Sequence, residues 1–274
     1  MKIVFLVCAC ISIAAVITIC LFMFANGVPA IKEIGITKFL FGTQWRVSQN
    51  LFGIWPMIVG SIYVTAGAMI IGVPIGLLTA VFLAKYCPKK LYKFIKPIIN
   101  LMAGIPSIIY GFFGLVILVP FVRDTFGGRG MSVLTASILL GLMILPTIIS
   151  MSEASIRAVP QSYYEGGLAL GASHERSVFF TVVPAAKSGI FASVVLGVGR
   201  AIGETMAVMM VAGNQTVIPE KITDGVRTLT TNIVMEMGYS TDLHREALIA
   251  TAVVLFVFIL IINLSFSLLK RRSK

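Results

Sequence analysis

The chain carries the polar stretch Gln161-Ser-Tyr-Tyr-Glu-Gly-Gly-Leu-Ala-Leu-Gly-Ala-Ser-His-Glu-Arg-Ser-Val-Phe-Phe-Thr-Val-Val-Pro184 between two long apolar runs. Ser162 and Glu165 have the spacing of a capping box, in which each side chain satisfies a free amide at the start of a helix. Gly171 fits the left-handed position that ends a short helix, and Ser173 can cap a second helix running toward Pro184. The stretch therefore predicts an ordered helix-turn-helix loop, shaped to be bound by a partner protein.

Composition places this loop on a membrane protein. Of the 274 residues, 58% are hydrophobic and only 12% are charged, whereas a soluble domain carries about 25% charged residues. The net charge of +11 comes largely from basic residues in short loops beside apolar runs. That arrangement follows the positive-inside rule better than it fits nucleic-acid binding, so no nucleic acid is expected as a partner.

Apolar runs predict six membrane-spanning helices in an all-α protein, because each is long enough to cross a bilayer. They lie at about residues 3–25, 57–84, 98–122, 131–151, 189–212 and 247–269. The first is about twice the length of the apolar part of a signal peptide, so we expect it to be retained. One transmembrane domain is expected over 1–274, with a core at about 57–269, the N-terminal span at 3–25 and a cytoplasmic loop at 152–188.

Two predictions concern the first connection. Within the polar residues 26–56, the side chains of Ile31, Ile34 and Phe39 recur at roughly helical spacing, which favours a helix lying on the membrane surface. Trp45 and Trp55 fit the aromatic belt at a membrane–water interface.

Small residues mark the second and third spans. Gly67, Gly72 and Gly76 in the second span allow helix backbones to approach closely, which predicts burial in a bundle. A basic loop at 85–96 follows, and the third span is then interrupted by Gly104-Ile-Pro-Ser107. Such a break is tolerated where protein or water covers the freed backbone groups. It indicates either a broken helix lining a pathway or a kinked packing helix.

The distribution of Lys and Arg predicts the orientation. With the N-terminus inside, the inner segments hold 13 basic residues and the outer loops hold 8, while the acidic residues number three inside and seven outside. Both termini and the 161–184 loop are therefore expected to face the cytoplasm.

Arg200 and Glu204 are the two ionisable residues well within a predicted span. A charge at the bilayer centre costs about 2.5–3.5 kcal/mol, so such residues are usually paired and functional. Four residues apart, they are expected to share a helix face and form an ion pair. The pair would either hold the bundle together or carry an anion, with Arg200 binding an oxyanion and Glu204 releasing and re-engaging it. Gly199 and Gly203 predict a face for close helix packing.

The sequence offers little support for an enzyme or a metal protein. It has no Gly-x-x-x-x-Gly-Lys-[Ser/Thr] loop to cradle nucleotide phosphates and no convincing nucleophile–base arrangement. Its four cysteines lack Cys-x-x-Cys spacing, and His174 and His244 are isolated, which indicates ordinary loop residues. We expect no metal site and no cofactor.

Glu165, Gly171 six residues later and Pro184 thirteen after that resemble the EAA loop of ABC-importer permeases, where the membrane subunit seats its ATPase. Two further segments, 103–114 and 199–207, resemble the phosphate-specific importer permeases, the C-type subunit of the Pst system. The loop departs from that pattern, since Gly166 and Gly167 replace two alanines at about 1 kcal/mol of helix propensity each.

The resemblance implies a type I ABC-importer permease in a bacterial or archaeal cell membrane. It implies a heterodimer with a second related permease, two cytoplasmic ATPases, an extracytoplasmic phosphate-binding protein and phosphate as cargo. ATP hydrolysis would then occur on a partner chain. The residues implied in the substrate pathway are Arg200, Glu204 and Ser107, and those implied in ATPase coupling are Glu165, Gly166, Gly167, Gly171 and Pro184.

Three alternatives remain. A sister permease for sulfate or molybdate shares the fold and the loop. An ion-coupled secondary carrier or channel works without ATP. A membrane-embedded enzyme is the weakest option, because the spans offer one charged pair.

Overall fold

The computed structural model describes residues 1–272, without the side chains of 266, 267 and 269–272. Residues 273 and 274 lie outside the described residues, and they include Lys274, one of the 13 inner basic residues counted above. The elements are α1 (Lys2–Ile34), α2 (Ile36–Phe41), β1 (Trp45–Arg46), η1 (Val47–Gln49), β2 (Leu51–Phe52), α3 (Trp55–Val81), η2 (Phe82–Tyr86), α4 (Lys89–Gly104), α5 (Ser107–Phe113), η3 (Gly114–Leu118), α6 (Val119–Phe126), α7 (Val133–Arg157), α8 (Gln161–Ala169), α9 (His174–Ser177), η4 (Val178–Val182), α10 (Val183–Ala185), α11 (Lys187–Gly203), α12 (Met206–Val211), α13 (Leu229–Met237) and α14 (Asp242–Arg272).

Helices dominate this part of the chain, as predicted. Five of them are long and apolar enough to cross a membrane, and the bent pair His174–Ala185 and Lys187–Gly203, at an angle of 68°, makes six if it counts as one span. The all-α membrane fold with five or six spans is therefore confirmed.

The bundle core is built around α3 and α7. A Cβ added to Gly67 would lie 2.3 Å from the Ser137 Oγ, and one added to Gly76 would lie 2.8 Å from the Ile148 side chain. Glycines thus let the two helices approach each other, which confirms the predicted close packing of the second span. Buried side chains from α3, α7, α11 and α12 complete the main core.

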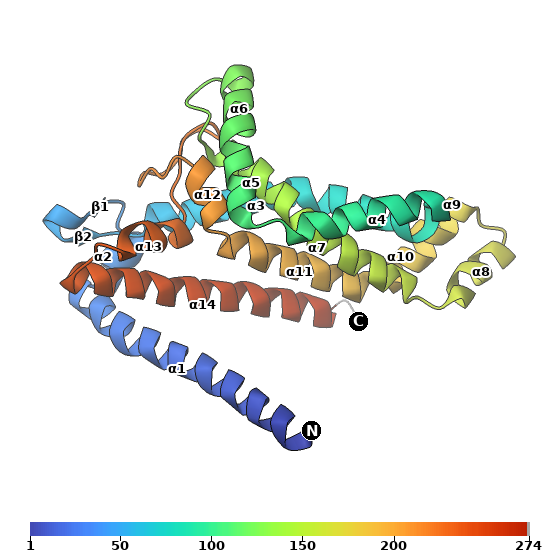
Figure 1. The fold of residues 1–274 in the computed structure, drawn as a ribbon, viewed down its shortest axis with the longest axis horizontal. Helices are drawn as coiled ribbons and strands as arrows, with labels where there is room; N and C mark the ends of the chain where they lie inside the picture. Colours follow the sequence, from blue (N-terminus) through green and yellow to red (C-terminus); the bar gives the residue numbers. More distant parts are fainter. Residues whose placement is uncertain (273–274) are drawn as a thin grey trace.

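The two ends of the bundle differ. Figure 1 shows α8 and α9 at one end, and the hairpin β1–β2 with α2 and α13 at the other. The helix α1 packs closely against α14 near that second end, where a Cβ added to Gly27 would lie 2.7 Å from the Val253 side chain. It then diverges from the bundle toward the N-terminus (Figure 1). Most of α1 is exposed.

The prediction of a surface helix in residues 26–56 is wrong. The helix α1 continues to Ile34, and the hairpin pairs Trp45 with Phe52. Phe39 is fully buried in a cluster with these two aromatic rings and α14 residues. Trp45 lies inside this cluster and donates its indole N–H to Glu236, so its side chain is held by contacts within the chain.

The third span begins later than predicted. The basic segment 85–96, predicted as a loop, lies largely in α4, and α4 ends at Gly104. Ile105 has an extended backbone, as expected for a residue that precedes proline. Ser107 then begins α5, the start of the spanning helix 107–126. The predicted break is thus confirmed, and the helix leaves the direction of α4 at this point (Figure 1).

Candidate functional site

The helix α8 begins differently from the predicted capping box. Pro160 precedes its first residue and no side chain caps it. Pro160 is the N-cap, with an extended backbone at ψ 138°, so Ser162 falls inside the helix and cannot cap it. Glu165 is exposed and forms no hydrogen bond or ion pair within residues 1–272. Its carboxylate is available to a partner.

The turn between α8 and α9 matches the prediction. Gly171 has a φ of +81°, its N–H donates to the Leu168 carbonyl at 2.9 Å, and the Ala172 N–H donates to the Gly167 carbonyl at 3.1 Å. This is the double hydrogen bond of a Schellman motif, which ends a helix at glycine. The Ser173 hydroxyl accepts from the Arg176 N–H and caps α9.

The two glycines of α8 have different surroundings. A Cβ on Gly166 would meet open space, whereas a Cβ on Gly167 would lie 2.6 Å from the Ser177 Oγ and 3.1 Å from its Cβ. Gly167 therefore permits the close approach of α8 to α9. This packing explains why Gly167 stands where the family pattern has alanine. No contact within the described chain explains the glycine at position 166.

His174 holds the 161–184 loop against the bundle, so its prediction as an isolated loop residue is wrong. Its Nδ1 is 2.7 Å from the Tyr164 hydroxyl of α8. Its ring also meets the edge of Tyr86 in η2, with the centroids 4.7 Å apart. Beyond α9, Pro184 lies in α10, just before the chain bends by 68° into α11.

The 161–184 loop exposes several apolar side chains that are not covered by other parts of the described chain. Leu170 is 91% exposed, and Tyr163, Leu168 and Phe180 are exposed as well. A hollow of about 340 Å³ between Pro160, Tyr163 and Gly189 separates α8 from the start of α11. Exposed apolar side chains beside a free carboxylate are typical of a protein-binding surface.

Arg200 and Glu204 do not form the predicted ion pair. The helix α11 ends at Gly203, and Glu204 is extended with ψ of 126°, so the two side chains do not share a continuous helix face. The Glu204 carboxylate instead accepts from the Ala207 N–H at 3.3 Å, at the start of α12. Arg200 donates to the Thr147 hydroxyl of α7 at 3.4 Å, and no described acidic side chain pairs with it.

The glycines beside Arg200 correct a second prediction. A Cβ on Gly199 or Gly203 would have no neighbour within 4 Å, while a Cβ on Gly197 would meet Ile148 at 3.2 Å. Within the described chain, Gly197 therefore supports helix packing and the predicted Gly199–Gly203 face does not. That face is open.

Ser107 lies at the other helix break. It is the first residue of α5 and is partly buried, and among residues 1–272 it has no hydrogen bond to Arg200 or Glu204. Across the break, the Tyr110 hydroxyl donates to the Met102 carbonyl of α4 at 3.0 Å. The helix α5 packs on α12, since a Cβ on Gly111 would lie 3.0 Å from the Ala207 Cα. The structure therefore packs together the two helices that follow the breaks at 105–106 and 204–205.

Two buried acidic clusters escaped the sequence analysis. The first, the Glu153 cluster, consists of Glu153 with Lys96, Arg157 and Tyr92 at the end of α7 that leads into the 161–184 loop. The i, i+4 spacing of Glu153 and Arg157 could have predicted their ion pair. The pairing with Lys96, 57 residues away, had no such local signal.

The second, the Glu236 cluster, lies at the opposite end of the bundle. The Glu236 carboxylate accepts from Arg227 at 2.6 Å, from the Trp45 indole at 2.8 Å and contacts His244 at 2.9 Å. His244 is buried in this cluster and stacks on Phe52, so it too is not an ordinary loop residue. The cluster joins the hairpin, the loop before α13 and the start of α14.

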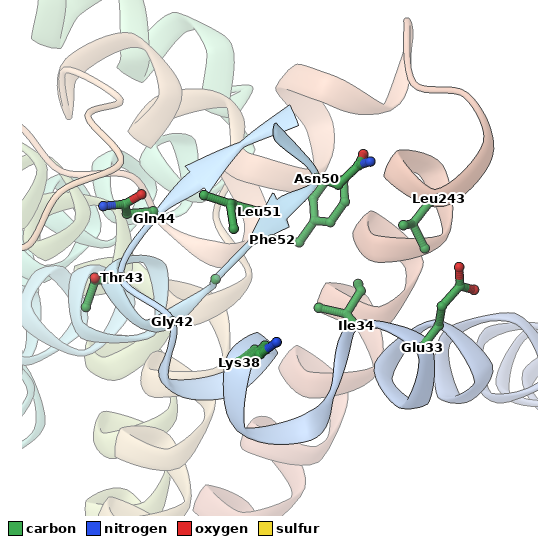
Figure 2. Close-up of a pocket in the computed structure, with 11 residues that line it drawn as sticks. Glu33, Ile34, Lys38, Gly42, Thr43, Gln44, Asn50, Leu51, Phe52 and Leu243 are labelled. Carbon is green, nitrogen blue, oxygen red and sulfur yellow. The ribbon is translucent and has the colours of Figure 1, made fainter. Parts of the chain in front are cut away.

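Beside this second cluster lies a pocket of about 500 Å³. Figure 2 shows Glu33 and Ile34 from α1, Lys38 from α2 and Leu243 from α14 around it. Asn50 and Phe52 of the hairpin segment face it from the other side. The pocket has a mixed polar and apolar lining at the end of the molecule opposite the 161–184 loop. Among the described residues, no group of three or more metal-ligating side chains forms a metal site.

Comparison with known proteins extends these observations. Residues 72–274 match the family described as "Binding-protein-dependent transport system inner membrane component". The chain is 39% identical over 267 residues to the probable ABC transporter permease protein YqgH of Bacillus subtilis, covering 93% of this chain and 86% of that protein. It is 34% identical over 264 residues to the phosphate transport system permease protein PstC of Xylella fastidiosa, covering 89% and 81%.

Solved structures share the fold. A chain of a bacterial alginate ABC transporter, crystallised with an alginate-bound periplasmic protein, matches with a TM-score of 0.66 at 15% identity over 97% of this chain and 94% of that one. A chain of the inward-facing MetNI methionine ABC transporter matches with a TM-score of 0.64 at 22% identity over 81% and 97%. The type I importer permease fold is thereby confirmed.

Proposed function

The chain belongs to the binding-protein-dependent transport system inner membrane components, and from this premise we propose that it moves inorganic phosphate through an ATP-driven importer. It is a multi-pass permease subunit of the cell membrane. The proposed cargo is supported by its 31–34% identity to several phosphate transport system permease proteins over most of its length.

The observation that carries the proposed cargo is the environment of Arg200. This guanidinium lies on α11 beside α7, makes one long hydrogen bond to the Thr147 hydroxyl, and pairs with no acidic side chain in the part of the chain described. An unpaired cation inside a bundle is costly unless something compensates it. A phosphate anion does so, because the guanidinium presents a fork of donors that matches an oxyanion.

Glu204 has a more local part in this proposal. Its carboxylate caps the start of α12, and its backbone carbonyl accepts from Thr230 at 3.3 Å. These two hydrogen bonds fix the extended backbone of Glu204, which follows the end of α11 and the helical turn that carries Arg200. Ser107, at the break that precedes the packed helix α5, is proposed to line the same pathway.

The 161–184 loop is proposed to bind one of two cytoplasmic ATPases. Glu165 and the exposed Leu170 offer a charge and an apolar anchor, while Gly167 and Gly171 set the geometry between the two short helices. ATP would close the ATPase dimer, and the loop would transmit that movement to α7 and α11. The bundle would then open outward to receive phosphate, and hydrolysis would return it inward.

Partners at the other faces follow from the same proposal. A related second permease would pair with this chain as a heterodimer, and the open Gly199–Gly203 face is available for it or for the pathway. A phosphate-binding protein would dock at the end that holds the Glu236 cluster and the pocket of Figure 2. Both termini and the 161–184 loop would face the cytoplasm.

Radiolabelled phosphate uptake into proteoliposomes tests this function. The vesicles hold the chain with its candidate permease, ATPase and binding-protein partners, with or without ATP on the ATPase side. Uptake that requires ATP and resists excess sulfate and molybdate is expected. Inhibition by either anion would change the cargo to a sister oxyanion, and uptake without ATP would replace the importer with an ion-coupled carrier.

A further inference from the structure

Glu153 is a buried carboxylate that the transport pathway does not use. Its side chain is 3% exposed, and each of its oxygens is bound by a cation from a different position. Oε2 accepts from the Lys96 ammonium of α4 at 2.8 Å, and Oε1 accepts from the Arg157 Nε at 2.8 Å. Removing one partner of such a pair leaves an uncompensated charge, so the cluster holds its members together.

Arg157 extends this cluster to the end of α3. Its Nη2 donates to the Leu83 carbonyl in η2 at 2.8 Å, and its guanidinium lies 4.7 Å from the centre of the Tyr92 ring in α4. The neighbouring Glu153 carboxylate, together with burial, raises the pKa of the Tyr92 hydroxyl above its ordinary value. The phenol stays protonated at neutral pH and can donate to the carboxylate.

The cluster lies between the two regions that an importer has to connect. Arg157 is the last residue of α7, and only three residues separate it from α8, which begins the 161–184 loop. The same loop contacts η2 through His174 and Tyr86, and η2 provides the carbonyl that binds Arg157. The loop is therefore attached to the Glu153 cluster by the chain and by a side-chain contact.

On its other side, the cluster holds α4. This helix packs Ile99 against Ile149 of α7 in a small apolar cluster, and the Lys96 ion pair adds a charged link between the same two helices. The far end of α4 is tied across the helix break to α5 by Tyr110. The helix α5 packs on α12, which follows Glu204.

We infer that Glu153 is a positioning residue that couples the movement of the 161–184 loop to α4 and, through the break at 105–106, to the helices beside Arg200. The inference rests on the proposed function, since it assigns a role in ATP-driven transport. The ion pair is the charged part of the contact between α4 and α7, beside the apolar contact of Ile99 with Ile149.

The test measures phosphate uptake and ATP hydrolysis in the same vesicles, and takes the ratio of phosphate moved to ATP consumed. A loss of folded protein lowers both quantities together and leaves the ratio unchanged. We expect Glu153→Gln to lower the ratio about fivefold, within the range for residues that modulate coupling between sites.

The double variant Glu153→Gln with Lys96→Met guards against misfolding, because it leaves no unpaired charge in the pair and the introduced amide oxygen can still accept from Arg157. We expect the same lowered ratio, whereas a wild-type ratio in the double variant would overturn the inference. Lys96→Arg keeps the cation and should keep the ratio.

Lys93→Met is the matched control, since this exposed lysine of α4 pairs with no acidic side chain within the described residues. A wild-type ratio is expected, and an equal fall would overturn the inference. Wild-type vesicles that move no phosphate would contradict the proposed function instead, and the ratio would then be measured with the oxyanion that they transport.

Discussion

Glu153 and Arg200 are both charged side chains within the helical bundle, but their surroundings are opposite. Both oxygens of Glu153 are bound by cations of the same chain, whereas Arg200 has a single long hydrogen bond to a neutral hydroxyl. Glu236 at the other end of the molecule likewise has partners on both oxygens, Arg227 on one and the Trp45 indole on the other, whereas the exposed Glu165 resembles Arg200 in having no charged partner in the described chain. A charged group whose atoms are all bound within the chain holds secondary-structure elements together. A charged group without such partners is available to a ligand or a partner protein.

The largest effect expected from this contrast concerns Glu165, whose carboxylate has no partner in the described chain. Glu165→Lys should remove ATP-driven uptake almost completely, because it reverses the charge at the proposed ATPase interface, where unfavourable juxtaposition of charges costs on the order of several kcal/mol. Thermal unfolding of the purified chain should not change. Uptake is measured in vesicles, and membrane abundance by immunoblot. Normal uptake in this variant would remove the coupling role of the loop.

Glu236 should show the reverse behaviour. Glu236→Ala leaves Arg227 buried without its acidic partner, so the free energy of unfolding should fall by about 3–5 kcal/mol. Phosphate uptake per folded molecule should stay near that of the wild type. Denaturation in detergent gives the stability, and Glu246→Ala, an exposed change on α14, is the control. An unchanged stability in Glu236→Ala would show that the Glu236 cluster does not hold these elements together.

The smallest effect distinguishes the two glycines of α8. Gly166→Ala should stabilise the helix by up to about 1 kcal/mol, because alanine has the higher helix propensity and the added Cβ meets open space. Gly167→Ala should lose this gain, since Ser177 must move to admit the new methyl group. Unfolding temperatures of the two variants provide the comparison. Equal gains would mean that α8 does not need its close approach to α9.

Much of this fold could be predicted from sequence because its signals are local. The apolar runs indicated the spanning helices, and the rules for helix ends placed Gly171 and Ser173 correctly. The capping box failed for an equally local reason, since Pro160 is the N-cap and the helix begins at Gln161, one residue before the predicted cap Ser162. The third span was predicted to begin at about residue 98, whereas the spanning helix begins with α5 at Ser107. The apolar residues at the end of the amphipathic helix α4 continue across the proline break into α5, so the two helices read as one apolar run.

The charged sites could be predicted in part. Spacing alone suggested that Arg200 and Glu204 pair, but α11 ends at Gly203, before Glu204. The hydroxyl of Thr230, 26 residues away, donates a hydrogen bond to the Glu204 carbonyl. The partners of Glu236 include Trp45, 191 residues away, and Lys96 reaches Glu153 over 57 residues. Such long-range pairs follow from packing and have no periodic signature in the chain.

The central claim is that Arg200 is left unpaired in order to bind the transported anion. Phosphate uptake by wild type, Arg200→Ala and Arg200→Lys, measured beside their thermal unfolding, tests it most directly. We expect Arg200→Ala to lose uptake and keep its stability, and Arg200→Lys to keep part of the uptake because it retains the charge without the fork of donors. Uptake by Arg200→Ala at the wild-type rate, or a loss of uptake explained by unfolding, would contradict the claim.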